Sequence, residues 1–285
     1  MPLPPDRLPL RRQGSWRKRW RYVGIFGEEI LACAARVSVG PIGQTFWLVW
    51  DRRAERLWER TKTRLPGARG EVWTEALDKD GLRDHAPDAG SQLRIEAVHP
   101  KAGPVRAFAR LGPGQWAESV CAAGPRNYVW TRKRADVPVE ADIRVGDERF
   151  RFEARGMEDE SEGYHPRHTV WDWSAGVGRS TDGRSIGWNL ASGINDPPRN
   201  SERAIWVEGE PQEPGPVSFE GLDAIAFDDG ARLEFAAECE RHKQERKPFV
   251  RYSHRQPFGS FSGTLPGGLE LERGLGVMEH HEAHW

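Results

Sequence analysis

Residues 165–176, with the sequence HPRHTVWDWSAG, bring two histidines, an arginine, an aspartate and two tryptophans together. In a strand, alternate side chains point to opposite faces. One face then carries His168, Val170 and Asp172. The other face carries Arg167, Thr169, Trp171 and Trp173. Both faces mix polar and apolar groups, as does a barrel wall around a ligand. The alternative is a sheet whose tryptophans fill the core while its charged groups pair or reach solvent.

The same segment places His165, His168 and Asp172 at the spacing H-x2-H-x3-D, a set of ligand types that zinc accepts. Spacing alone supplies neither the distances nor the hydrogen bonds that orient metal ligands. We therefore predict no metal and no cofactor.

The C-terminal segment VMEHHEAHW has a similar composition. In an extended chain, His280, Glu282 and His284 share one face, and Glu279 and His281 share the other. Two histidines beside a glutamate can bind a cation or titrate near neutral pH. Because polar chain ends are commonly exposed, a solvated terminal strand is the favoured interpretation.

Two glycine-rich segments lack the key positions of catalytic motifs. GSFSG at 259–263 has Phe261 where the nucleophile elbow has serine. GVGRSTDG at 176–183 lacks the G-x-G-x-x-G spacing and the α/β context of a dinucleotide site. A third segment, RSIGWNLASGIND, places Asn189 beside Trp188 in an apolar run. A buried amide must be hydrogen-bonded, so Asn189 either ties the chain together or contacts a ligand.

The elements that position these residues are predicted to be strands. The 31 glycines and 21 prolines divide the chain into short segments that alternate polar and apolar residues. Turn residues separate several of these segments, as at 145–148 and 228–230. A helix is plausible only at 51–64, and even there the alternation typical of a strand competes with it. We predict an all-β fold with few short helices, divided into a basic lead-in at 1–20, an N-terminal lobe at 21–155 with an insertion at 61–91, and a C-terminal lobe at 156–285 that begins in the acidic, turn-rich segment 156–166.

Composition restricts the partners. A net charge of -1 argues against a nucleic-acid binder. The basic residues between Arg7 and Arg21 could contact anionic lipid, but a solvated lead-in is the favoured interpretation. No signal peptide or transmembrane segment is evident, and the three separated cysteines suit a reducing compartment, so we predict a cytoplasmic protein. The 35 arginines against 7 lysines fit a GC-rich, bacterial genome.

The order of several motifs resembles the DUF2804 family, a domain of unknown function. The motifs are KRWRYVGIFG, Trp171-x-Trp173 with a following glycine, DGRSIGWNLASGIND, FGSFSG, and a C-terminal Glu279 before a final tryptophan. That family is similar in layout to AttH-like and carotenoid hydratase proteins. The resemblance implies two lipocalin-like antiparallel β-barrels and an apolar pocket. Some members of the broader group hydrate or cyclise polyenes or terpenoids with acid assistance.

Two functions remain open. The favoured one is binding of an apolar or amphipathic small molecule, with Trp171, Trp173 and Trp188 as wall residues and Arg167 or Asn189 orienting its polar end. The alternative is a hydratase, isomerase or cyclase in which a buried carboxyl group protonates an alkene. Asp172 is the first candidate for that acid, with His168 or Glu279 as alternatives.

Overall fold

The computed structural model describes the chain except residues 1, 5, 65–69, 75–89, 248–249 and 285. The described residues form two large antiparallel sheets and one small hairpin of β1 (Arg11–Arg12) and β2 (Ser15–Trp16), and they contain no helix. The expected few short helices are therefore absent from the described residues. The same residues offer no helix that could cross a membrane.

The first sheet has the strand order β6-β5-β4-β3-β12-β11-β9-β8-β7, with β10 paired to β11. Its strands are β3 (Lys18–Phe26), β4 (Ile30–Val39), β5 (Ile42–Asp51), β6 (Arg56–Arg64), β7 (Val72–Thr74), β8 (Ser91–His99), β9 (Gly103–Leu111), β10 (Ala117–Ala122), β11 (Tyr128–Val145) and β12 (Glu148–Gly163).

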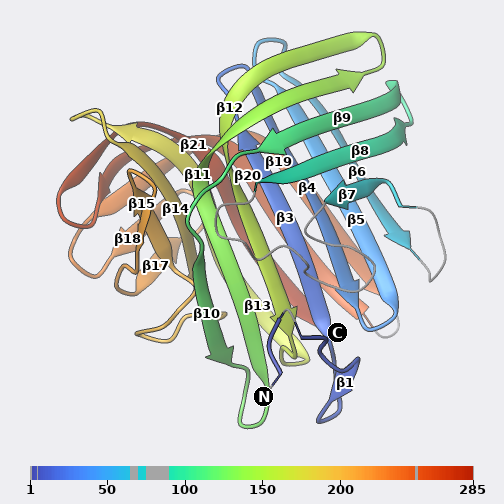
Figure 1. Cartoon of the computed structure of the whole chain (residues 1–285), viewed down its shortest axis with the longest axis vertical. Helices are drawn as coiled ribbons and strands as arrows, with labels where there is room; N and C mark the ends of the chain where they lie inside the picture. The colour runs from blue at the N-terminus through green and yellow to red at the C-terminus, as the bar shows by residue number, and fades with distance from the viewer. Residues whose placement is uncertain (1, 5, 65–69, 75–89, 248–249, 285) are drawn as a thin grey trace.

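The second sheet has the order β16-β15-β14-β13-β21-β20-β19-β18-β17. Its strands are β13 (His168–Ser180), β14 (Ser185–Ser192), β15 (Ala204–Val207), β16 (Glu210–Gln212), β17 (Val217–Glu220), β18 (Ala224–Phe227), β19 (Arg232–Lys247), β20 (Val250–Leu265) and β21 (Leu269–His284). The edge strands of each sheet do not pair with each other, so each sheet is a curled half-barrel (Figure 1).

The three largest apolar clusters among the described residues pack against these sheets. One fills the curve of the first sheet and includes Trp47 and Val139. Another fills the curve of the second sheet and includes Trp188 and Phe261. The remaining cluster combines residues of both sheets, such as Met157, so the two half-barrels pack against each other through facing surfaces. Those facing surfaces are where buried polar groups from the two sheets can meet.

The turn predictions at 145–148 and 228–230 are confirmed. Val145 ends β11 and Glu148 begins β12, while Gly146 adopts a φ of 59°. The second turn joins β18 to β19, with Gly230 at a φ of 89°. A left-handed φ at these positions explains the glycines, because other residues adopt it at a cost.

Of the two alternatives at 51–64, a helix or an alternating strand, the structure has a turn followed by a strand. Asp51 ends β5, and its Oδ1 accepts hydrogen bonds from the backbone amides of Arg53 and Ala54 at 3.1 and 3.0 Å. This local bonding favours a turn over a helix. The following residues form β6, in which Trp58 packs into the core of the first half-barrel.

The acidic segment predicted to be a turn-rich boundary belongs to a buried strand. β12 runs through residue 156 and stays in the first sheet until Gly163, and the second sheet begins at His168. Its carboxylates pair with a basic run on β11, as described below. The division of the chain into lobes at 155–156 stays a prediction. Of the proposed 61–91 insertion, 61–64 lie in β6 and 72–74 form β7, whereas 65–69 and 75–89 lie outside the described residues.

Candidate functional site

The predicted alternation of residues 168–173 is confirmed on β13. His168 and Val170 are exposed, whereas Thr169 and Trp173 are buried. Over residues 168–173 the buried face packs toward the first sheet, and the other face is reached by solvent. Only part of the predicted set of site residues therefore lies between the sheets.

The residues of the outer face are surface groups. Asp172 is 31% exposed, and its Oδ1 lies 2.7 Å from Nδ1 of His280. Nε2 of His168 lies 3.1 Å from Oε1 of Glu282, and Arg167 is exposed. Asp172 is therefore not a buried carboxyl group, because solvent and His280 both reach it.

Trp188 belongs to the core of the second half-barrel, away from Trp171 and Trp173. Its side chain is fully buried, donates to Oγ of Ser174 at 3.1 Å and meets the Phe261 ring edge to face. A Cβ at Gly176 would overlap the Trp188 ring, which explains the glycine three residues after Trp173.

Asn189 ties the chain together. Its Oδ1 accepts from Nε1 of Trp173 at 2.8 Å, and its Nδ2 donates to the backbone oxygen of Glu202 at 2.9 Å. Both side chains are buried. Asn189 was expected either to tie the chain together or to contact a ligand. In the structure its hydrogen bonds are internal.

Glu279 is the predicted acid that lies between the sheets. Its carboxylate accepts from Nε1 of Trp171 at 2.9 Å and from Nε2 of Gln256 at 2.8 Å, and it lies 2.9 Å from Nε2 of His254. Burial alone would raise the pKa of Glu279, but the proximity of His254 and the hydrogen bonds from His254 and Trp171 outweigh burial and lower the pKa to about 2. Glu279 is therefore an ionised acceptor and not a proton donor at neutral pH.

Arg241 fixes the tautomer of His254. Its guanidinium lies 2.6 Å from Nδ1 of His254 and donates to Oγ1 of Thr61 at 2.8 Å. A guanidinium only donates hydrogen bonds, so Nδ1 of His254 accepts and Nε2 carries the proton toward Glu279. Burial lowers the pKa of His254, which agrees with a neutral ring.

Aromatic rings surround this carboxylate. Trp171 stacks on His281 with ring centroids 4.0 Å apart and on Trp20 of the first sheet at 6.4 Å. Tyr22 meets Trp173 edge to face at 5.3 Å. The C-terminal strand thus contributes its inner face, Glu279 and His281, to the interface, and the expectation that it is simply solvated holds only for its outer face.

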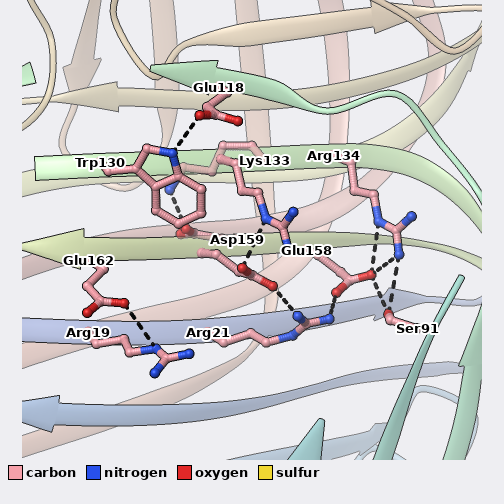
Figure 2. Close-up of polar contacts among 12 residues, drawn as sticks. Arg19, Arg21, Ser91, Glu118, Trp130, Lys133, Arg134, Glu158, Asp159 and Glu162 are labelled. Atoms are coloured by element: carbon pink, nitrogen blue, oxygen red, sulfur yellow. Dashed lines mark hydrogen bonds and ion pairs between the residues drawn. The ribbon is translucent and has the colours of Figure 1, made fainter. Parts of the chain in front are cut away.

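A second ionic group lies on the same facing surface. Lys133 pairs with Asp159 and lies 3.4 Å from Oε2 of Glu202, which also accepts from Asn195 at 2.9 Å (Figure 2 shows Lys133 and Asp159). Burial raises the pKa of Asp159 to about 6, against the opposing effect of Lys133 and with the help of Glu202. The sequence made Asp172 the first candidate for a buried carboxyl group that donates a proton. In the structure, the buried carboxyl group whose pKa is raised is Asp159.

The opposite face of β11 and β12 carries a charged chain inside the first half-barrel (Figure 2). Arg21 bridges Glu158 and Glu160, which pair in turn with Arg134 and Arg132. All five side chains are buried, and the Trp116 ring lies over both outer guanidiniums at 4.2 and 4.6 Å. Sequence reasoning missed these residues. The signal was present, because the basic run 132–134 and the acidic run 158–160 pair in register across one hairpin.

Several buried polar atoms between the sheets have no hydrogen-bond partner among the described residues. They include both ring nitrogens of His165, Oγ1 of Thr131 and Oγ of Ser161. Thr131, Ser161 and Trp20 are direct neighbours on three adjacent strands, and the His165 ring lies 4.7 Å from that of Trp20. Nearby, Lys18 donates to the Pro166 oxygen at 3.0 Å, and burial lowers its pKa to about 7.

A cavity of about 790 Å³ lies elsewhere, at the first sheet where β8, β9, β11 and β12 meet. Its charged lining residues are Arg110, Glu140, Glu153 and Arg155. This cavity has no aromatic lining and shares no residue with the interface cluster.

Two curled antiparallel sheets that pack face to face, with buried polar and aromatic groups between them, define an all-β protein built from two half-barrels. The chain belongs to the family described as a domain of unknown function, DUF2804, whose family model matches residues 6–285. The resemblance inferred from the motif order is thereby confirmed.

Two crystal structures share the fold. A protein of Nitrosomonas europaea assigned as AttH is 14% identical, with 98% of each chain covered and a TM-score of 0.54. Kievitone hydratase from Nectria haematococca is 12% identical, with 92% of this chain and 88% of that chain covered and a TM-score of 0.54. Among curated proteins, no sequence matches this chain significantly. At these identities the likeness concerns the fold.

Proposed function

We propose that the protein binds an apolar or amphipathic small molecule, such as a lipid, terpenoid or polyene, between its two sheets. The observation that carries this proposal is the group of unpartnered buried atoms on His165, Thr131 and Ser161. An unsatisfied buried polar group costs about 1–3 kcal/mol. A ligand group that bonds to these atoms removes that cost, so the polar end of the ligand belongs here.

The chemistry of these atoms suits a hydroxyl or carbonyl group. Burial keeps the pKa of His165 well below its usual value, so its ring is neutral and offers one donor and one acceptor. Thr131 and Ser161 add two hydroxyls. Trp20, Trp171 and Trp173 provide apolar surface beside them, as ligand sites commonly do. Trp20 and Trp171 are only half-buried, and we expect them to move when a ligand binds.

The test begins with native mass spectrometry and organic extraction of the purified protein, followed by titration with the polyene fatty acid cis-parinaric acid. We expect a co-purifying small molecule and a saturable rise in probe fluorescence. Trp20→Ala is expected to weaken probe binding, whereas the exposed Trp16→Ala is the matched control. The proposal is contradicted if no small molecule co-purifies with the protein and the probe fluorescence does not change.

His165→Leu separates binding from folding. Leucine removes two unpartnered nitrogens from a buried position, so we expect the free energy of unfolding to rise by about 1 kcal/mol while probe affinity falls about tenfold. A purely structural His165 would give the opposite change in stability. Urea unfolding and probe titration of the same preparation measure both effects.

A second candidate function is acid-catalysed hydration or cyclisation of such a ligand, and the burial and raised pKa of Asp159 favour it. In the hydration, the Asp159 proton passes to an alkene carbon, water adds to the resulting cation, and the surplus proton of that water returns to Asp159. Kievitone hydratase, which shares the fold, is a hydratase by name. Asp159→Asn should abolish turnover of an identified ligand and retain its binding, with the exposed Asp172→Asn as control.

A further inference from the structure

The outer face of β13 and β21 carries a cluster that the interface site does not use. Nε2 of His168 lies 3.1 Å and Nε2 of His284 lies 3.7 Å from the same oxygen, Oε1 of Glu282. One ligand atom from each of the three residues lies within 4.8 Å of the others. The two imidazoles stack with centroids 3.9 Å apart and an interplanar angle of 10°.

The strand register produces this arrangement. His168 and His284 are direct partners across β13 and β21, and Glu282 lies two residues from His284 on the same face. β21 lies between β13 and β20 within the second sheet, so backbone hydrogen bonds on both sides hold it. The three side chains are therefore brought together by the fold and not by a loose chain end.

The distances suit a tetrahedral metal. With metal–ligand bonds of about 2.0–2.1 Å, the ligand atoms of tetrahedral zinc are roughly 3.3 Å apart. The separations of 3.1 and 3.7 Å need adjustments of a few tenths of an ångström, and the side chains, about half exposed, have room to make them. Imidazole nitrogens suit zinc, copper and nickel.

We propose that His168, Glu282 and His284 form a surface site for a divalent transition metal of the zinc type. Two imidazole nitrogens and one carboxylate oxygen supply three ligands and leave the remaining position open to solvent. Water can accept the second N–H of each exposed ring, so no tautomer is enforced against the metal.

Both negatively and positively charged side chains lie near this site on the same face. Asp172, paired with His280 at 2.7 Å, adds negative charge near Glu282. Arg251 on β20 lies opposite His284 in the register and opposes a cation. Arg255, opposite His280, is paired with Glu240 at 2.7 Å. Arg251→Gln is therefore expected to tighten metal binding severalfold.

The experiment is calorimetric titration of the metal-stripped full chain with ZnCl2. We expect one saturable site, and we expect the double variant His168→Ala/His284→Ala to bind about tenfold or more weakly. His242→Ala, which removes another exposed histidine on β19, should bind like the wild type. The zinc-induced shifts of the His168 and His284 imidazole NMR signals locate the metal.

Two results would overturn the proposal: no binding up to about 0.1 mM zinc, or zinc binding by the double variant within about threefold of the wild type. Neither result bears on small-molecule binding between the sheets, because the two sites use opposite faces of β21. Both substituted histidines are exposed, so the variants are expected to fold.

Discussion

Two clusters of two histidines and one glutamate lie on opposite faces of the same strand, β21. The inner cluster is His254, Glu279 and His281, and the outer cluster is His168, Glu282 and His284. In each cluster the potential ligand atoms lie within 4.8 Å of one another. By residue type and distance alone, the two would be equally good metal sites.

The two clusters differ in the group that contacts the histidine nitrogen facing away from the glutamate. Inside, Arg241 donates to Nδ1 of His254, so the Nε2 proton points at Glu279 and occupies the direction that a metal would need. Histidines that bind metals usually donate their other N–H to an acceptor. The inner cluster is therefore a hydrogen-bond network that positions a carboxylate, whereas the outer cluster is free to adopt the tautomers that a metal requires.

The largest expected contrast concerns stability. Glu279→Ala leaves the buried donors of Gln256 and His254 and the half-buried donor of Trp171 without their acceptor, so we expect the free energy of unfolding to fall by about 3–5 kcal/mol. Glu282→Ala on the outer face should change it by about 0.5 kcal/mol or less. Urea unfolding followed by tryptophan fluorescence measures both, and equal losses would refute the distinction between the faces.

The inner carboxylate also predicts a dependence of stability on pH. The pKa of Glu279 is about 2 in the folded protein and 4.5 as the reference, so its ionised form stabilises the fold by about 3 kcal/mol above pH 4.5. This contribution is lost as the pH falls from 4.5 toward 2. Asp159 has the opposite sign, because its raised pKa of about 6 makes the fold less stable as the pH rises from about 4 to 6.

Urea unfolding between pH 3 and pH 6 separates these two contributions. Glu279→Gln should be less sensitive to acid than the wild type below pH 4.5, and Asp159→Asn should remove a loss of stability between pH 4 and 6. Glu282→Gln controls for the removal of one negative charge from the same strand. Parallel pH profiles for all four proteins would contradict the assigned pKa shifts.

Arg241→Gln should make the inner cluster resemble the outer one, because it allows the His254 tautomer that a metal requires. The glutamine oxygen can accept a hydrogen bond from Nδ1 of His254, which releases the Nε2 lone pair toward Glu279. We expect the zinc stoichiometry to rise from one to two, with about a tenfold or greater gain in affinity at the inner cluster. Calorimetry measures the stoichiometry, and Arg255→Gln is the matched control because Arg255 is an exposed arginine on β20. A folded Arg241→Gln protein without a second zinc would show that the tautomer is not what prevents binding.

Much of the fold followed from alternation and turn residues, since these are local properties. The faces of β13 and β21 were predicted correctly from a period of two. Helix and strand both stayed open at 51–64, because the turn that starts at Asp51 depends on side-chain bonding to backbone amides and not on alternation. The acidic run on β12 looked like a solvated boundary because its basic partners lie about 26 residues earlier on β11.

The candidate site was harder to predict from the sequence than the fold. Alternation grouped Asp172 with His168 and Glu279 with His281, but it does not say which face of each strand meets another sheet. Only the packing of the half-barrels decides that Glu279 is buried and Asp172 partly exposed. Arg241 and Asp159 come from strands far from the quoted motifs, so no local pattern connected them with Glu279.

The smallest expected effect is that of Asp172→Asn, the substitution that the sequence alone would have ranked first for catalysis. Asp172 and His280 are 31% and 42% exposed, and surface ion pairs contribute about 0–1 kcal/mol. We therefore expect a loss of less than 1 kcal/mol in urea unfolding and unchanged cis-parinaric acid binding. Because Asp172 adds negative charge near Glu282, zinc affinity should fall only slightly, by a factor of about two to three. A loss of probe binding in Asp172→Asn would instead mean that the ligand occupies the outer face, and it would reverse the functional assignment of the two faces of β21.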